Sequence, residues 1–259
     1  MSDPVSDPVR EREAPFFVGW AAIPEGLRWF LVGIALGLLL LLAGLSYLTA
    51  ATQDDPGAGA FMGRADAVGM LQATPYPILH VTQSESFDPG TALMLTGNGK
   101  RGAQAQADAF DGQLVAVSGA RIARGDIIAL QLRGGENGIS AAPEKTGDSL
   151  PEPRDLGRWR ITGEICDGKC YAGAMRPGRG LAHKACANLC LIGGIPPVFV
   201  ATDKIDGTEF FMLADQNGGP VTEHVLNHVA TLVEVEGSVE RHGAMAVFRI
   251  DPSTLRLAQ

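Results

Sequence analysis

A gapless internal repeat constrains the fold of this chain more than any other feature of its sequence. The passage LVAVSGARIARGDIIALQL at 114–132 aligns with LVEVEGSVERHGAMAVFRI at 232–250. Both copies alternate apolar and polar residues, and both carry a glycine in mid-strand (Gly119 and Gly237) and another six residues later. Alternation of this kind is typical of strands, and a strand glycine often marks a bulge or a barrel bend. The repeat therefore predicts the same β-hairpin at the end of two related domains.

The segments before each hairpin predict an OB-like barrel. In the second domain, three strands and then a helical stretch are expected at 159–165, 197–201, 209–213 and 221–230. In the first domain, two strands and a helical stretch are expected at 76–81, 91–95 and 102–110. Three strands, a helix and two strands is the element order of the OB-fold, a five-stranded Greek-key barrel. We therefore predict a mainly β protein with two OB-like five-stranded barrels.

An uncharged apolar run, 29–51, predicts a single transmembrane helix before the barrels. As a helix it would be about 34 Å long, enough to cross a hydrocarbon core of about 30 Å. Arg10, Arg12 and Arg28 precede the run, whereas only Arg64 follows nearby. The positive-inside rule then places the N-terminus in the cytoplasm and the barrels in the periplasm of a bacterial inner-membrane protein. A cleaved signal peptide is the alternative, although the apolar core exceeds the usual signal length.

These features divide the chain into five parts and exclude one class of partner. The predicted parts are a cytoplasmic N-terminus (1–28), a transmembrane helix (29–51), a first OB-like domain (52–133), a linker (134–157) and a second OB-like domain (158–259). The formal net charge is −8. Nucleic-acid binding depends on neutralising phosphates, so we expect no nucleic-acid partner. No motif for a catalytic triad, a phosphate loop or a carboxylate pair is present, so we do not expect an enzyme.

All four cysteines lie in an expected insertion of the second domain, 166–197, and one histidine lies among them. These residues are Cys166, Cys170, His183, Cys186 and Cys190. The stretch 181–191 lacks Gly and Pro and should be a short helix with its cysteines one turn apart on one face. Sulfur and nitrogen ligands in this number suit zinc or Cu(I).

Three interpretations of this cluster remain open from the sequence. An even number of cysteines in an oxidising compartment favours two disulfides that would staple the insertion, each worth about 3 kcal/mol. The second interpretation is a metal site formed by Cys170, His183, Cys186 and Cys190. The third is a thiol–disulfide exchange site, which lacks the usual C-x-x-C motif.

The insertion also collects basic residues on an acidic protein. Lys169, Arg176, Arg179 and Lys184 are opposed within it only by Asp167. A basic loop on a β-scaffold could contact a partner protein, and the alternative is an ordinary solvated loop.

The spacing of these residues resembles a motif of small exported bacterial proteins that are mostly uncharacterised. The matching residues are Cys170-Tyr171, His183-x-x-Cys186-Ala-x-x-Cys190 and Gly194-x-Pro196-Pro197. The resemblance covers about 30 residues on an OB-like domain, and Cys166 is the least typical of the cysteines. It implies a shared local structure and no particular activity.

Together these patterns predict a non-catalytic, membrane-anchored accessory subunit. A disulfide-stapled loop would contact a protein partner, such as a membrane-bound redox complex. The alternative is a periplasmic protein that binds copper or zinc through the Cys/His cluster. The first domain, which has no cysteine, is expected to act as a spacer.

Overall fold

The computed structural model describes residues 25–52, 57–134, 137–142 and 148–258 of a mainly β chain. It separates into two units, Met1–Asp55 and Pro56–Gln259. In the first unit, helix α1 (Glu25–Thr52) includes a stretch long and apolar enough to cross a membrane, Gly26–Thr49, with mean hydropathy 2.4. The prediction of an apolar N-terminal helix is confirmed, and its length and composition suit an anchor or a signal sequence alike. The predicted N-terminal segment lies outside the described residues up to position 24.

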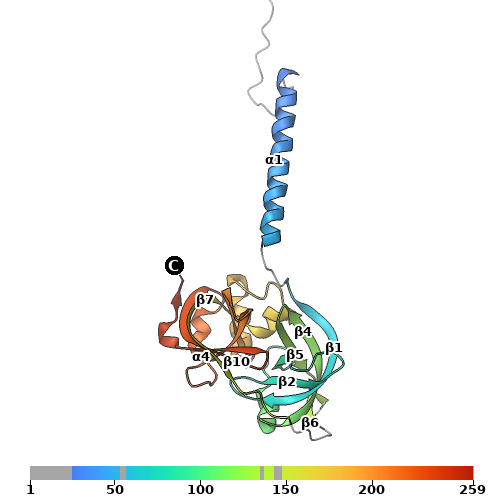
Figure 1. The fold of residues 1–259 in the computed structure, drawn as a ribbon, viewed down its shortest axis with the longest axis vertical. Helices are drawn as coiled ribbons and strands as arrows, with labels where there is room; N and C mark the ends of the chain where they lie inside the picture. The colour runs from blue at the N-terminus through green and yellow to red at the C-terminus, as the bar shows by residue number, and fades with distance from the viewer. Residues whose placement is uncertain (1–24, 53–56, 135–136, 143–147, 259) are drawn as a thin grey trace, which may run out of the picture. The chain divides into compact units, whose positions relative to one another are not determined.

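Two sheets and a few short helices make up the second unit (Figure 1). The first sheet and its short helices comprise β1 (Ala60–Gln72), β2 (Ile78–Gln83), β3 (Ala92–Thr96), α2 (Gln104–Ala107), η2 (Asp108–Phe110), β4 (Leu114–Arg124), β5 (Ile127–Leu132) and β6 (Ile139–Ala141). The second sheet and its short helices comprise β7 (Arg154–Asp167), η4 (Cys170–Ala174), η5 (Leu181–His183), α3 (Lys184–Ile192), β8 (Pro197–Ile205), β9 (Thr208–Ala214), α4 (Thr222–Val225), η6 (Leu226–His228), β10 (Leu232–His242), β11 (Met245–Ile250), η7 (Pro252–Thr254) and β12 (Arg256–Leu257).

The second sheet closes into a five-stranded barrel. Its pairings run from β7 to β8, β9, β11 and β10, and β10 pairs again with β7. Every pairing is antiparallel except that of β9 with β11. The short strand β12 adds to β10. The predicted strands and the helix before the hairpin are all present in this barrel, with longer strands than the sequence pattern gave.

The first sheet uses the same order of pairings. Strands β1, β2, β3, β5 and β4 pair in succession, β3 with β5 is the parallel pair, and β1 also pairs with β4. Strand β1 has no counterpart among the strands predicted from the sequence. The residue that could have revealed this strand is Gly69, which pairs with Val115 in β4. In the second sheet, Gly163 of β7 pairs with Val233 of β10 in the equivalent way. An apolar residue two positions on each side of both glycines could have revealed the match.

The mid-strand glycines show why the repeat is so regular. A Cβ at Gly119 would lie 2.3 Å from the carbonyl oxygen of Gln131, and a Cβ at Gly237 would lie 2.3 Å from that of Arg249. Both partners are on the second strand of the hairpin, at equivalent positions. Only glycine allows the strands to cross this closely where the sheet bends. The predicted hairpins are confirmed at both places.

Each sheet has its own apolar core, and a third cluster joins them. This shared cluster contains Met94 and Ile122 from the first sheet and Cys166, Phe210 and Met212 from the second. The segment predicted as a linker, 134–157, contains β6 and the start of β7. The two sheets pack as one compact unit, because each covers apolar surface of the other.

Candidate metal centre

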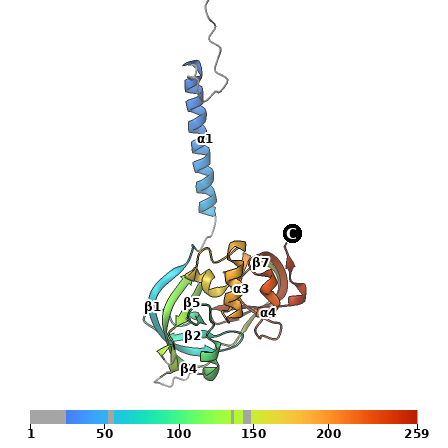
Figure 2. The ribbon, with the colours of Figure 1, turned by 180° about the vertical axis from the view of Figure 1, so that it is seen from behind.

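The cysteine-bearing insertion connects β7 to β8, as predicted, and lies against the first sheet. Helix α3 carries Cys186 and Cys190, and in the view of Figure 2 it lies between the strands of the two sheets. A Cβ at Gly193 would lie 1.8 Å from the carbonyl oxygen of Lys100, and Gly102 N–H donates to the Gly193 carbonyl at 2.8 Å. Glycine at the end of α3 thus allows the loop 97–102 of the first sheet to pack directly on the insertion.

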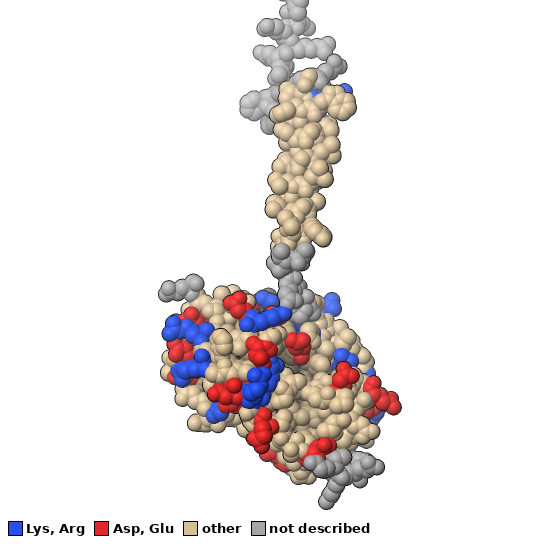
Figure 3. Space-filling model, viewed as in Figure 1, with Lys and Arg blue, Asp and Glu red and all other residues tan. Residues whose placement is uncertain are grey.

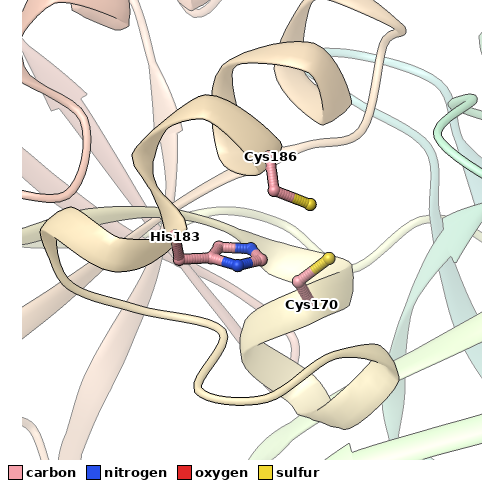
Figure 4. Close-up of side chains that lie close together, drawn as sticks. All are labelled: Cys170, His183 and Cys186. Carbon is pink, nitrogen blue, oxygen red and sulfur yellow. The ribbon is translucent and has the colours of Figure 1, made fainter.

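Three of the predicted residues converge. The side chains of Cys170, His183 and Cys186 come from η4, η5 and α3 and point toward one another (Figure 4). One potential ligand atom from each lies within 4.8 Å of the others. Cys170 and His183 are buried and Cys186 is partly exposed. The helix predicted over 181–191 is confirmed as η5 and α3, and it provides the one-turn spacing of these side chains.

Cys190 joins the same centre through Cys170. The two sulfurs lie 3.9 Å apart, and the ligand atoms of Cys170, Cys190 and Asp167 also lie within 4.8 Å of one another. Two sulfurs bound to one ion at about 2.3 Å, with a tetrahedral angle between them, would lie about 3.8 Å apart. The sulfur separation of Cys170 and Cys190 thus matches that of two ligands of one ion.

The predicted disulfide staple is wrong for this structure. All four cysteines are free, and the bonded distance between sulfurs would be about 2.05 Å. The reason is geometric, because the cysteines of the first C-x-x-x-C pair point in different directions. Cys166 is the next-to-last residue of β7, and its side chain is buried in the shared core cluster. Successive strand residues face opposite sides, so Asp167 points into the centre and Cys166 points away from it.

Asp167 holds two residues of the centre, Cys170 and His183, in place. Its side chain is fully buried, and its Oδ1 accepts a 2.8 Å hydrogen bond from the backbone N–H of Cys170. Its Oδ2 lies 3.1 Å from His183 Nε2. A carboxylate that accepts from one ring nitrogen of a histidine is the usual support of a metal-binding histidine. This contact leaves Nδ1 as the nitrogen of His183 that could bind an ion.

The first sheet contributes a cation. Lys100 Nζ donates to Cys186 Sγ at 2.6 Å and lies 3.7 Å from Cys190 Sγ. This hydrogen bond, opposed by a smaller desolvation effect, raises the pKa of Lys100. The charge of this ammonium group is among the effects that lower the pKa of Cys190, after the hydrogen bond from Cys170. No sequence pattern pointed to Lys100, because it is far from the cysteines in the chain.

The two neighbouring thiols of Cys170 and Cys190 titrate as a pair. The hydrogen bond between them, together with burial, raises the pKa of Cys170, and the same hydrogen bond lowers the pKa of Cys190 despite burial. Of the two thiols, Cys190 therefore loses its proton more readily than Cys170. By contrast, burial raises the pKa of Cys166 well above its usual value, as expected of an inert core thiol.

The four basic residues of the insertion differ in their exposure and in the groups that they contact. Lys169 is only 3% exposed, and its Nζ donates to the carbonyls of Gly97 and Gly99 at 2.7 and 2.8 Å. It fixes the loop that carries Lys100 and so cannot contact a partner, which corrects that part of the prediction. Burial lowers the pKa of Lys169.

The other three basic residues stay near the surface. Arg176 donates to the Gly59 carbonyl at 3.4 Å, Arg179 lies 3.8 Å from Glu164, and Lys184 donates to the Asn227 carbonyl at 2.8 Å. On the face drawn in Figure 3, basic and acidic side chains are intermixed. One ion pair of the second sheet is that of Arg160 with Glu236, at 2.6 Å. Charges of opposite sign thus lie side by side on that face.

Comparison with known proteins adds no family to this description. The chain matches no family model, no curated protein and no solved structure at a significant level. The resemblance to exported bacterial proteins therefore stays a prediction. The function has to be inferred from the side chains themselves.

Proposed function

We propose that this chain is a membrane-anchored protein that binds one soft transition-metal ion, copper or zinc, in its second barrel. The observation that carries the proposal is a pair of overlapping groups, Cys170/His183/Cys186 and Asp167/Cys170/Cys190, which share the thiol of Cys170. The buried Asp167 also supports His183. Three sulfurs and one nitrogen are a known ligand set for zinc, and thiolates also select Cu(I). Burial of Cys170 and Cys190 would shield a bound ion from competing ligands.

The scaffold and the location belong to the same proposal. Both sheets are OB-like barrels, a reading supported by their common strand order and by their equivalent glycines. Helix α1 is the anchor, supported by its length and hydropathy. The arginines before it are on the cytoplasmic side under the positive-inside rule, which places the barrels in the periplasm.

Metal analysis of the full chain tests the proposal. Protein extracted in mild detergent without chelators should contain about one copper or zinc ion per chain. Cys170→Ser should lose the ion, because the thiol central to both ligand groups is removed. Cys166→Ala is the matched control and should keep the ion, since Cys166 faces the core. Less than about 0.1 ion per wild-type chain, even after incubation with each metal, would refute the site.

A second function, contact with a protein partner, is supported by the surface around the centre. The insertion exposes Leu181, Leu189 and Ile192, which are 71%, 56% and 66% exposed. Neighbouring apolar side chains of this size are often covered by a partner. In this proposal the partner is a subunit of a complex in the same membrane. Purification in mild detergent would test it, and a monomer that runs alone at low and high salt would contradict it.

A further inference from the structure

A gradient of exposure leads from the surface into the metal centre. Met175 is 46% exposed and Cys186 is partly exposed, whereas Cys170, His183 and Cys190 are 4%, 4% and 2% exposed. Met175 directly follows η4 and has an extended backbone. All five side chains therefore belong to one insertion, with a thioether at its outer end.

The sulfur of Met175 is close enough to share an ion with the centre. Its Sδ lies 3.4 Å from Cys186 Sγ. Two sulfur ligands of one ion would be about 3.8 Å apart, so a small adjustment could accommodate an ion between them. The Sγ of Cys186 is in turn within 4.8 Å of Cys170 Sγ. An ion could thus move inward by exchanging one ligand at a time.

The chemistry of the outer pair favours a monovalent ion. A thioether is a neutral, soft ligand of the kind that selects Cu(I). The ammonium group of Lys100 also lies 2.6 Å from Cys186 Sγ, and its repulsion of a monovalent ion is half its repulsion of a divalent ion at the same distance. Both the thioether and the ammonium group therefore favour Cu(I) over the divalent zinc ion at the outer pair, Met175 and Cys186.

We propose that Met175 is the entry ligand of the centre and that the ion it admits is Cu(I). The ion leaves its carrier and first binds Met175 and Cys186 at the surface, and the thiol proton of Cys186 passes to water. As its bond to the Met175 sulfur breaks, a bond to the Cys170 sulfur forms and the thiol proton of Cys170 passes to water. No electron is transferred in this exchange. This inference rests on the proposed function, because the inner residues must form a metal site for an entry ligand to serve.

Transfer kinetics with the full chain in detergent test the role of Met175. The metal-free protein is mixed without oxygen with a coloured Cu(I) chelate, and the loss of colour reports uptake. Met175→Leu should slow uptake about tenfold without changing the final amount bound, because it removes an outer ligand and keeps the inner ones. Met62→Leu is the matched control, since Met62 is an exposed methionine of β1 (58% exposed) and should leave the rate unchanged. Zinc uptake from a coloured zinc complex should be equal in all three proteins.

A second substitution separates ligation from packing. Met175→Cys provides another soft sulfur at the same position and should restore rapid Cu(I) uptake. Equal slowing in the Leu and Cys variants, or a wild-type rate in Met175→Leu, would overturn the proposal. A wild-type protein that takes up zinc but no Cu(I) would also overturn it and leave the metal site standing. Uptake of neither ion would refute the proposed function itself.

Discussion

The two sheets of the second unit, Pro56–Gln259, share their strand pairings but differ in the connections between strands. Residues 73–77 join β1 to β2, whereas 168–196 separate β7 from β8 and carry the cysteine centre. After the third strand it is the first sheet that contributes to the centre. The loop that follows β3 carries Lys100, whose Nζ contacts Cys186 Sγ. The first sheet is therefore more than a spacer. A repeated scaffold has acquired its chemistry in two different loops that meet where the sheets pack together.

This comparison can be extended to single positions. If the two sheets are aligned so that Gly69 of β1 matches Gly163 of β7, Asp167 takes the place of Ala73. In the same alignment, the pairings of β2 and β8 put His80 in the place of Val200. Asp167 contacts Cys170 and His183 in the candidate metal centre, and His80 is buried. The four predictions below test these differences, beginning with the largest expected effect.

His80 should make the stability of the protein depend on pH. Its Nε2 contacts Gln72 at 3.1 Å, and burial, followed by the nearby His242, lowers its pKa from 6.5 to about 4. Between these values the unfolded chain binds a proton that the folded chain does not. The free energy of unfolding should therefore fall as the pH drops from 6.5 toward 4, by up to about 3 kcal/mol.

Urea unfolding over this pH range would measure the effect of His80. In His80→Val, which copies the second sheet, most of the pH dependence should be lost. His224→Val is the control because His224 is exposed, and it should behave like the wild type. An unchanged pH dependence in His80→Val would show that His80 is not the responsible group.

Asp167→Asn should weaken metal binding about 10- to 100-fold, because the neutral amide no longer stabilises and orients His183 as a carboxylate does. Competition with a chelator of known affinity would measure the change. Asp203→Asn removes an exposed carboxylate from β8 and should have no effect. Equal affinity in the Asn variant at position 167 would mean that the carboxylate does not support the site.

Gly119→Ala and Gly237→Ala should destabilise the protein by similar amounts, about 1–3 kcal/mol each, because each Cβ meets a carbonyl oxygen at the same distance. Both variants should still unfold in one transition, since the sheets share a core cluster. Gly134→Ala is the control, with no atom within 4 Å of its new Cβ. A neutral effect at either mid-strand glycine would break the structural equivalence of the two hairpins.

Lys100→Met should have the smallest effect, a several-fold slower alkylation of Cys186 in the metal-free protein. The ammonium group that contacts the sulfur is lost, and a cysteine beside a cation is more reactive. Mass spectrometry of the modified peptide would follow the reaction. Arg101→Met removes the neighbouring exposed cation and serves as the control. An equal alkylation rate in both variants would mean that Lys100 of the first sheet does not affect the reactivity of Cys186.

Local patterns predicted much of this protein because they act within a few residues. The helix with Cys186 and Cys190 could be predicted because it lacks Gly and Pro, and the hairpins because their alternation is regular. Strand β1 was missed because its outer half, from Ala60 to Arg64, is exposed and shows no alternation. Asp167 and Met175 lie within the insertion, so their ligand chemistry could have been noticed there.

The sequence by itself determined the apolar helix, the repeated hairpins with their glycines, and the spacing of His183, Cys186 and Cys190. Each of these depends on backbone preferences or on side chains one turn apart, which the chain encodes locally. Only the tertiary structure decided that Cys166 faces the core, that Lys169 is buried, and that Lys100 reaches the thiols. Those outcomes depend on how two sheets pack against each other, and such contacts join residues too distant in the chain for any local pattern to report.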